Sequence, residues 1–325
     1  MTMETDTRKP TREGVLRAAA NIAAHFPPTP LLPFEAGGHT VWAKADCLQP
    51  MGAFKIRGAW HRLTEMSAEE RARGVVAVSS GNHAQGIALA ARMLGVEATI
   101  VMPQDAPRVK LERTAAYGAR VVTYDRMTEN REEIAKAIAA EKGATYAHAY
   151  GDPWVIEGQG SAGIEIAAQM QAQTGREVSR IVVCCGGGGL TAGLALACPD
   201  ASIVPCEPEG WDDVCRSLES GEIQSVGANP PPTACDAIQT FATFPINFAV
   251  MKERCREWAR VSEKDIRDAQ RFAFAHLRLV LEPGGAAALA AVLAGKVTLD
   301  DSTAVMLTGG NTDAAAFAKV LANAD

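Results

Sequence analysis

Several features that mark other classes of protein are missing from this sequence of 325 residues. No apolar run approaches the roughly 20 residues that a membrane-spanning helix requires. Residues 1–11 are polar and lack the apolar stretch of a secretion signal, so we expect a cytoplasmic protein with no membrane partner. The net charge is −6 and the basic side chains form no stripe, which argues against nucleic acid as a partner.

The eight cysteines lack the Cys-x-x-Cys spacing of a zinc or redox site. This distribution indicates buried, reduced thiols, as in a cytosolic protein. With 47% hydrophobic and 22% charged residues, the composition is that of a globular chain with one large or two medium domains. The cysteines that fall within apolar segments are Cys184, Cys185, Cys198 and Cys206.

Short apolar runs alternate with helical patterns along the chain, which predicts an α/β fold with parallel sheets. Several runs are apolar almost throughout, as expected for strands that are covered on both faces. Three strand–helix units lie between residues 74 and 142, so this segment could form a small lobe of its own. We predict strands at residues 74–79, 98–102, 120–124, 180–185, 202–207 and 303–308, and helices at 81–94, 108–117, 129–142, 161–174, 190–198, 264–279 and 285–293.

A run of four glycines, Gly186, Gly187, Gly188 and Gly189, separates an apolar segment from a helical pattern that opens with Leu190. Glycines at such a place let consecutive N–H groups point inward beside the positive end of a helix dipole, which suits a phosphate monoester. The run continues into neither the nucleotide-hydrolysis motif nor the dinucleotide motif. The alternative is a tight turn that merely tolerates glycine, although four glycines in a row cost chain entropy.

Lys55 has an unusual setting, Gly52-Ala53-Phe54-Lys55-Ile56-Arg57-Gly58. Its apolar neighbours would disfavour the ammonium form and lower the pKa of the amine, as a lysine that forms a Schiff base requires. The alternative is an ordinary lysine on a solvated helix face. A reactive amine combined with a phosphate cup is what a pyridoxal phosphate (PLP) enzyme needs.

The segment Ser79-Ser80-Gly81-Asn82-His83 lies where a predicted strand ends and a helix begins. Free N–H groups and hydroxyls at such a place could bind a carboxylate. Asn82 and His83 add polar groups that a simple capping turn does not need. The alternative is that Ser80 only caps the helix.

Together these segments resemble the fold-type-II PLP enzymes, which are similar to the tryptophan synthase β subunit, and within them the threonine/serine dehydratase and serine racemase branch. The resemblance extends over about residues 28–313. It implies two parallel-sheet lobes with flanking helices. A large PLP-binding domain would comprise residues 1–69 and 149–325, and a small mobile domain of residues 70–148 would grip the substrate. The matching segments are 28–31, 53–59, 79–86, 158–160, 186–190, 243–246, 282–283 and 308–311.

The resemblance also implies a role for each matched residue. Lys55 would link covalently to PLP and Asn82 would bond its phenolic oxygen, while Thr308 would face the pyridine nitrogen. Ser80 would face the substrate Cα on the side opposite the lysine. Arg131 falls where racemase-like members place an arginine near the substrate carboxylate, although a plain surface arginine is the alternative. The further cofactor contacts are Phe54, Gly186, Gly187, Gly188, Gly189, Leu190 and Glu282, and the further substrate contacts are Ser79, Gly81, Asn82 and His83.

Two departures from the family pattern concern the cofactor contacts. Many relatives have serine where this chain has Ala53, which removes a hydroxyl close to the Lys55 amine. The contact to the pyridine nitrogen is more often serine or cysteine, and Thr308 keeps the hydroxyl but adds a methyl group. Neither change removes a required group, but both leave the substrate open.

A divalent cation is predicted at Glu207, Trp211 and Asp213, because the segment Glu-Pro-Glu-Gly-Trp-Asp-Asp has the spacing of a cation site in this branch. Two carboxylates and the carbonyl of Trp211 would suit Mg²⁺ or Ca²⁺. The alternative is a helix N-terminus that favours acidic residues.

The predicted function is PLP-dependent deamination of 3-hydroxy amino acids such as L-threonine and L-serine to 2-oxo acid and ammonia, by an ammonia-lyase that is a homodimer in most of this family. Serine racemase, 3-hydroxyaspartate dehydratase and a dehydratase for a bulkier 3-hydroxy amino acid remain open. A phosphate- or nucleotide-sensing module without catalysis is the alternative of another class. That alternative predicts a colourless protein, whereas the enzyme predicts a yellow one with PLP on Lys55.

Overall fold

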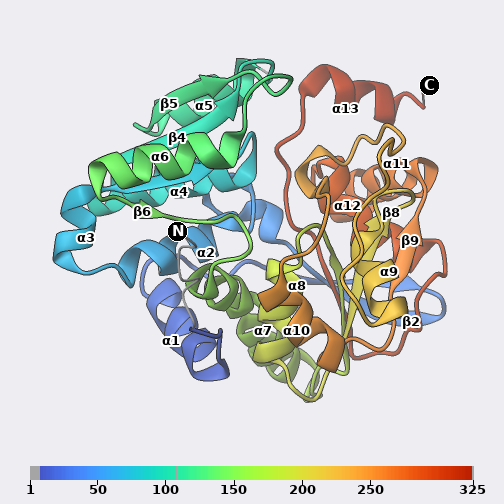
Figure 1. Ribbon diagram of the computed structural model, residues 1–325. Coiled ribbons are helices and arrows are strands. Elements are labelled where there is room, and N and C mark those ends of the chain that lie inside the picture. The colour runs from blue at the N-terminus through green and yellow to red at the C-terminus, as the bar shows by residue number, and fades with distance from the viewer. Residues whose placement is uncertain (1–7, 107, 324–325) are drawn as a thin grey trace.

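The computed structural model describes residues 8–106 and 108–323, which form two lobes, each built around its own sheet (Figure 1). The larger sheet has the strand order β1-β2-β10-β7-β8-β9 and the smaller has the order β5-β4-β3-β6. All pairs run parallel except the β1–β2 hairpin, which confirms the predicted α/β fold. The strands are β1 (Leu31–Ala36), β2 (His39–Lys44), β3 (Val75–Val78), β4 (Ala98–Pro103), β5 (Arg120–Tyr124), β6 (Thr145–Tyr146), β7 (Arg180–Cys184), β8 (Ser202–Pro208), β9 (Ala259–Val261) and β10 (Thr303–Met306).

Helices cover both faces of each sheet, and short helical turns join several elements. The helices are α1 (Arg12–Ala23), α2 (Lys55–Thr64), α3 (Ala68–Arg73), α4 (Asn82–Leu94), α5 (Arg108–Ala116), α6 (Arg131–Lys142), α7 (Pro153–Thr174), α8 (Gly189–Ala197), α9 (Asp213–Ser220), α10 (Pro245–Arg254), α11 (Glu263–Phe272), α12 (Pro283–Leu293) and α13 (Ala314–Leu321). The turns are η1 (Asp46–Leu48), η2 (Pro50–Gly52), η3 (Asp236–Ile238) and η4 (Ala273–Leu277). No helix in the described part of the chain is long and apolar enough to span a membrane.

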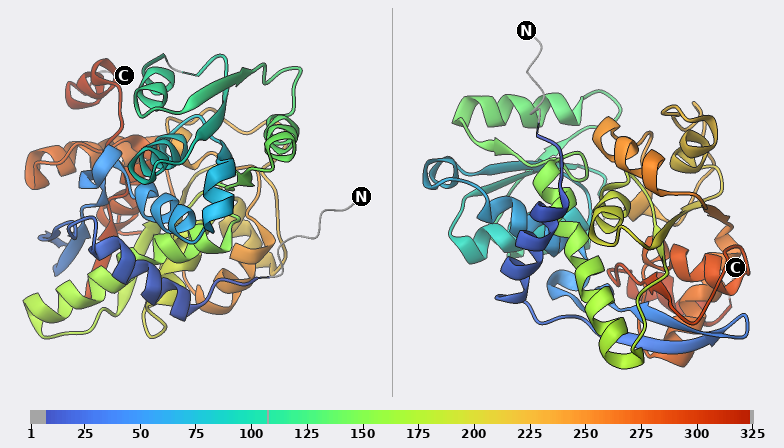
Figure 2. Two further views of the ribbon diagram at one scale, coloured as in Figure 1. Left: turned by 90° about the vertical axis from the view of Figure 1, so that its left-hand side faces the viewer. Right: turned by 90° about the horizontal axis from the view of Figure 1, so that it is seen from below.

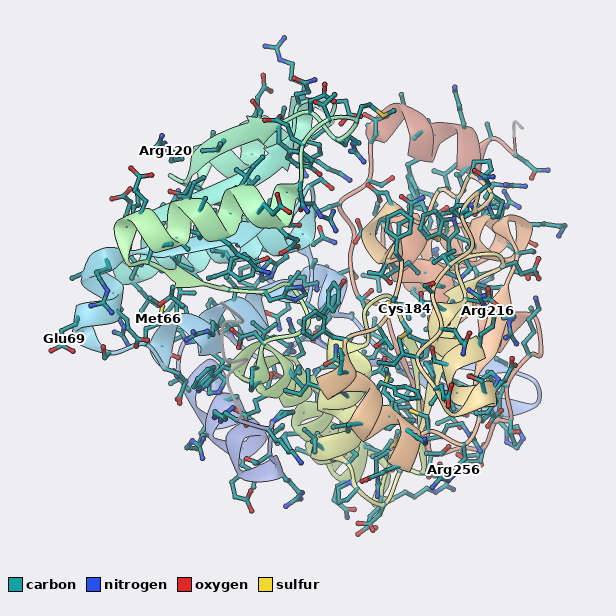
Figure 3. The ribbon with its side chains drawn as sticks, viewed as in Figure 1. Met66, Glu69, Arg120, Cys184, Arg216 and Arg256 are labelled. Carbon is teal, nitrogen blue, oxygen red and sulfur yellow. The ribbon has the colours of Figure 1, made fainter. Side chains whose placement is uncertain are left out.

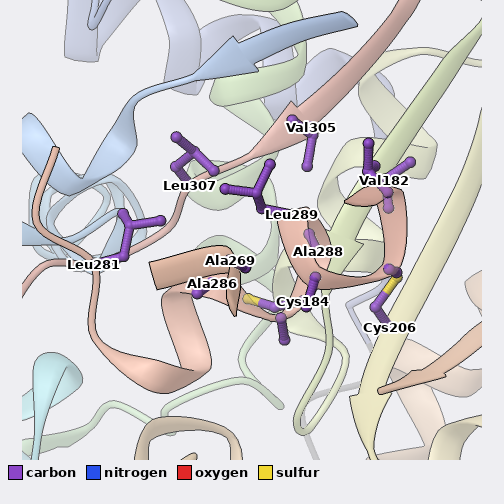
Figure 4. Close-up of a cluster of buried hydrophobic side chains, with 14 of the residues drawn as sticks. Val182, Cys184, Cys206, Ala269, Leu281, Ala286, Ala288, Leu289, Val305 and Leu307 are labelled. Carbon is purple, nitrogen blue, oxygen red and sulfur yellow. The ribbon is translucent and has the colours of Figure 1, made fainter. Parts of the chain in front are cut away.

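The core of the large lobe lies on both faces of its sheet because side chains of a strand alternate between faces. On β7, Val182 belongs to the layer formed with α11 and α12, whereas Ile181 belongs to the layer formed with α7 and α8. Figure 4 shows Leu289 of α12 beside Val305 of β10 in the first layer. A fully buried leucine of this kind contributes about 1.5–3 kcal/mol of stability. The apolar strand sequences are therefore explained by coverage on both faces.

The small lobe repeats this arrangement on a smaller scale. Its sheet is formed within residues 75–146, and α4 covers one face while α6 covers the other. Helix α2 of the large lobe packs against α4, so the two lobes share one apolar layer. The sheet lies inside the predicted small domain of residues 70–148, and the mobility of that domain stays a prediction.

The predicted strands and helices are present, with two corrections at helix boundaries. Helix α7 begins at Pro153 and not at residue 161, because Asp152 caps it by accepting hydrogen bonds from the N–H groups of Trp154 and Val155. The predicted helix at 264–279 ends as an α-helix at Phe272, continues as the π-helical turn η4, and stops at Arg278 in a left-handed conformation with φ of 61°.

The β1–β2 hairpin is an element that the sequence patterns did not predict. It lies at one edge of the large lobe, beside C-terminal segments of the chain (blue and red in Figure 2). Its two-residue turn, Gly37-Gly38, has φ values of 59° and 82°, the left-handed conformation that tight hairpins need and glycine adopts without strain. Strand β2 then continues into the parallel sheet beside β10.

Candidate active site

A cavity of about 160 Å³ lies where the carboxyl ends of strands from the two sheets meet. Val78, Tyr146 and Cys184 line it and are the last residues of β3, β6 and β7. Cys184 is labelled in Figure 3 near the centre of the molecule. Parallel α/β sheets bind ligands at this edge, because the loops there diverge and leave room.

Lys55 is the first residue of α2 and lines the cavity. Its Nζ donates a hydrogen bond to the carbonyl oxygen of Ala149 at 3.0 Å and lies 5.1 Å from the ring centre of Phe54. No carboxylate of the described residues pairs with it. Burial lowers the pKa of the Lys55 amine to about 8, and Cys184 offsets this shift in part. A substantial share of the amine is therefore neutral near physiological pH.

Close packing of α2 against α7 fixes the start of the helix that carries this lysine. Gly58 and Gly158 face each other, and a Cβ added to Gly158 would lie 2.6 Å from the Cα of Gly58. Arg57, fully buried, holds α2 from the other side through Asp46 and Glu165, with N–O distances of 2.6 to 2.9 Å. Packing against α7 and the ion pairs of Arg57 therefore fix the position of the helix that carries the Lys55 amine.

The glycine loop, residues 186–189, leads from β7 into the first residue of α8 and lines the cavity from the large lobe. The backbone N–H groups of residues 186–191 have no hydrogen-bond partner among the described residues. Gly188 adopts φ of 86°, and a Cβ on Gly187 would lie 2.2 Å from the ring of Tyr150. Unpaired donors at the positive end of a helix favour an anion, which is what the predicted phosphate cup requires. Binding of a phosphate by this loop stays a prediction.

The segment 79–83 leads from β3 into α4 and lines the cavity from the small lobe. The residue that caps α4 is Gly81, and no side chain bonds to the helix end, so the alternative that Ser80 serves as the cap is wrong. His83 is buried with its Nε2 3.2 Å from the carbonyl oxygen of Ala147. Burial, reinforced by Lys55, lowers the pKa of His83 to about 3, so this imidazole stays neutral.

Three further residues of the predicted cofactor set lie in or next to the cavity. Asn82 and Glu282 both line it, and the Nδ2 of Asn82 donates to the Oε1 of Glu282 at 2.5 Å. Burial raises the pKa of Glu282 to about 7. Thr308 lies directly behind the wall, with its Oγ1 3.1 Å from the Sγ of Cys184, and its carbonyl oxygen accepts a hydrogen bond from the N–H of Phe54.

Arg131, the first residue of α6, is exposed but also lines the cavity. It forms no ion pair with another described residue. Arg131 is thus a surface residue, and the surface at that place is the wall of the cavity. Its contact with a substrate carboxylate stays a prediction. Its charge is free to attract an anion.

One wall of the cavity was not predicted from the sequence. Tyr146, the last residue of β6, is followed at every second position by His148 and Tyr150, and all three line the cavity. The Nδ1 of His148 accepts hydrogen bonds from the N–H groups of Tyr150 and Gly151, so its proton is on Nε2. Burial lowers the pKa of His148 to about 4. The alternation of these three large polar side chains in the sequence is the pattern that could have predicted this wall.

Lys110 and Asp236 also line the cavity without having been predicted. They form an ion pair that joins α5 of the small lobe to η3 of the large lobe. No local pattern marks either residue, because the pair exists only when the two lobes pack together.

The predicted cation ligands lie outside the cavity. Both oxygens of Glu207 accept hydrogen bonds from N–H groups in the first turn of α9, Val214 at 3.2 Å and Cys215 at 2.7 Å. Asp213 is buried, and neither of its carboxylate oxygens has a hydrogen-bond partner in the described chain. Burial raises the pKa of Asp213 to about 7, and burial beside Asp213 raises that of Glu207 well above its usual range. Two buried acids side by side suit a cation, and the cation stays a prediction.

Comparison with known proteins shows the family of this chain. A family model described as pyridoxal-phosphate dependent enzyme matches residues 22–309. The chain belongs to this family. It is 37% identical over 321 residues to an L-threo-3-hydroxyaspartate ammonia-lyase of Saccharomyces cerevisiae, covering 96% of each chain. It is 36% identical to a serine racemase of Schizosaccharomyces pombe, covering 96% of this chain and 97% of that one.

Solved structures agree with this assignment. A threonine deaminase whose source is given as T.th. superposes with a TM-score of 0.85 at 39% identity, covering 94% of this chain and 99% of that one. A maize serine racemase has a TM-score of 0.87 at 30% identity, covering 97% and 98%. The resemblance stated from the sequence and the prediction of a PLP-dependent enzyme are confirmed. The roles of individual residues stay predictions.

The residues of the cavity fit PLP. The cofactor needs a neutral amine for its aldehyde, and Lys55 has a lowered pKa and no carboxylate partner in the described chain. It also needs donors for its phosphate, and the unpaired N–H groups of residues 186–191 supply them. Lys55 and the glycine loop line the same cavity, so one molecule can reach both.

Proposed function

We propose that this PLP-dependent enzyme deaminates 3-hydroxy amino acids such as L-threonine and L-serine. Water is first eliminated across Cα and Cβ, and water then adds back to release ammonia and the 2-oxo acid. The observation that carries the proposal is the meeting of Lys55, the glycine loop and the segment 79–83 in one cavity. Relatives named as threonine, hydroxyaspartate and serine enzymes support this substrate class.

PLP, when bound, takes up the negative charge that remains at Cα after that carbon loses its proton. The neutral amine of Lys55 accepts this proton, since burial keeps part of the amine uncharged. The hydroxyls and N–H groups of the segment 79–83 bind the substrate carboxylate at the start of α4. The hydroxyl on Cβ takes up a proton and departs as water. A water molecule then adds at Cα and releases ammonia, so the net reaction is loss of ammonia alone. The small lobe, which forms part of the cavity wall, excludes solvent from the reacting atoms.

A panel of 3-hydroxy amino acids tests this proposal. The purified protein is assayed for release of 2-oxo acid and ammonia, with Lys55→Ala as the inactive control. Borohydride reduction followed by peptide mass mapping is expected to find the cofactor on Lys55. A colourless protein whose Lys55→Ala variant still binds its ligand would instead support a sensing module without catalysis.

A second candidate substrate is 3-hydroxyaspartate, which carries a further carboxylate. Arg131 lines the cavity with no ion-pair partner in the described chain, and His148, whose proton is on Nε2, lines the same cavity. These two donors suit an additional carboxylate. Serine racemisation is a third candidate, because the hydroxyl of Ser80 lines the cavity and is not used as a helix cap.

We also propose a divalent cation, Mg²⁺ or Ca²⁺, with Asp213 and Glu207 as ligands. The unpaired oxygens of Asp213 support it. The described residues contain no group of three or more His, Cys, Asp or Glu side chains that could hold a metal, so the backbone carbonyl of Trp211 would have to complete the site. A homodimer and closure of residues 70–148 over the substrate are further proposals from the family resemblance, and a cytoplasmic location is proposed from the distribution of the cysteines. Light scattering of the purified protein tests the first of these.

A further inference from the structure

The side-chain amide of Asn82 is held at both ends. Its Nδ2 donates to the Oε1 of Glu282 at 2.5 Å, and its Oδ1 accepts from the Nδ2 of Asn311 at 2.8 Å. Asn82 opens α4 in the small lobe, whereas Glu282 precedes α12 and Asn311 follows β10 in the large lobe. The amide therefore joins the two lobes next to the cavity.

The orientation of this amide follows from a fixed backbone acceptor. The Nδ2 of Asn311 also donates to the carbonyl oxygen of Met51 at 2.8 Å. A carbonyl only accepts, so the atom of Asn311 that faces it must be the nitrogen. The same nitrogen faces Asn82, so the atom of Asn82 at that place must be its oxygen. The nitrogen of Asn82 then points to Glu282.

The two ends of the amide face different environments. Asn82 and Glu282 line the cavity, whereas Asn311 lines a separate outer depression with Met51 and Arg113. The oxygen of Asn82 is thus directed away from the cavity, and its nitrogen is directed to the cavity side. One N–H of this nitrogen is used by Glu282. The second N–H is the donor that Asn82 can offer to a ligand.

Gly309 leaves room for the hydrogen bond between Asn82 and Glu282, and two charged side chains act on Glu282 with opposite sign. A Cβ on Gly309 would lie 2.0 Å from the Oε1 of Glu282, so only glycine fits there. Glu282 is influenced by Asp236, which raises its pKa, and by Lys110, which lowers it. These two residues form an ion pair with each other, so their effects partly cancel.

We propose that Glu282 and Asn311 are positioning residues, which orient the amide of Asn82 so that it presents an N–H donor, and not its oxygen, to the ring of bound PLP. A ligand oxygen at this place must accept a hydrogen bond, and an ionised ring oxygen accepts best. The inference rests on PLP binding and not on which amino acid is the substrate, so it stands even if the proposed substrate is wrong.

Reversing the polarity at residue 311 tests the proposal in the holoenzyme. Asn311→Asp replaces the donor that faces the oxygen of Asn82 by an acceptor, and the amide loses its preferred orientation. We expect the dissociation constant for PLP to rise about tenfold. The pH midpoint of the absorbance change of bound PLP should rise by about one pH unit, because the ring oxygen loses a donor. Asn229→Asp, on an exposed loop, is the matched control with the same added charge.

A double-mutant cycle separates positioning from general damage. In an Asn82→Ala background, Asn311→Asp should change neither the affinity nor the midpoint further, because its effect acts through Asn82. Glu282→Gln keeps an acceptor oxygen and should alter PLP affinity less than about threefold, whereas Glu282→Ala should weaken it about tenfold. If Asn311→Asp does not fold, comparison of Glu282→Gln with Glu282→Ala tests the proposal in its place. An Asn311→Asp effect of equal size with and without Asn82, or a Glu282→Ala variant that binds PLP like the wild type, would overturn the proposal.

Discussion

The lowered pKa of Lys55 predicts how the rate of PLP uptake depends on pH. Only the neutral amine attacks an aldehyde, so the rate follows the neutral fraction of Lys55. Burial lowers this pKa from 10.5 to about 8. At pH 7.5 an amine with a pKa of 10.5 is about 0.1% neutral, whereas one with a pKa of 8 is about 24% neutral, a gain of roughly 240-fold. Uptake should therefore rise about tenfold per pH unit well below pH 8 and level off above it.

The assay follows absorbance after PLP is added to the protein freed of cofactor, in a series of buffers from pH 6 to pH 10. A lysine derivative with a blocked α-amino group, measured in the same buffers, is the control for ionisation of PLP itself. Borohydride trapping and mass mapping assign the adduct, and Lys55→Ala should form none at this site. Uptake that keeps rising above pH 9 in parallel with the lysine derivative would refute the argument that burial lowers the pKa of Lys55.

Three other substitutions test separate parts of the site. Gly187→Ala would place a Cβ 2.2 Å from the ring of Tyr150, so PLP titration should show affinity weakened about tenfold or more, while Gly227→Ala in open space should show no change. Asp213→Asn removes one of two buried acids, so melting curves should lose any stabilisation by Mg²⁺ or Ca²⁺, and an unchanged rise in melting temperature would exclude this residue as a ligand. Arg131→Gln should raise KM for 3-hydroxyaspartate about tenfold with little effect on L-threonine, and an equal loss for both substrates would contradict a role in binding the second carboxylate.

The sequence predicts the central strands well because burial on both faces gives them an unmistakable composition. It predicts neither α2 nor its length, although α2 carries Lys55. The reason is that Arg57, His61 and Arg62 are buried in this helix, so its inner face carries polar side chains where an amphipathic pattern would show apolar residues. Their partners, such as Asp46 for Arg57, come from elsewhere in the chain. Only the folded structure reveals the pairs.

The predicted parts of the site have a local sequence pattern, whereas the unpredicted parts depend on contacts that form only in the folded structure. The glycine loop is visible in the sequence because its backbone conformation and its contact with Tyr150 admit no side chain. Lys110 and Asp236 are invisible, because each is an ordinary surface residue until the lobes meet. The proposed cation ligands, Glu207 and Asp213, are only partly visible in the sequence. Their spacing is a local signal, but the helix-capping role of Glu207 emerges only from its bonds to α9.

The division of the cavity between the lobes has a chemical consequence. The large lobe contributes Lys55 and the glycine loop to the cavity, and these are predicted to hold the cofactor. The small lobe contributes the segment 79–83 and Arg131, which are predicted to bind the substrate. The proposed movement of the small lobe would therefore open the substrate side without releasing PLP. Asn82 is the exception, because it belongs to the small lobe and is bonded to Glu282 and Asn311 of the large one. Any opening that separates α4 from α12 must break these bonds, so the contact most exposed to lobe movement is also the one predicted to touch the ring of the cofactor.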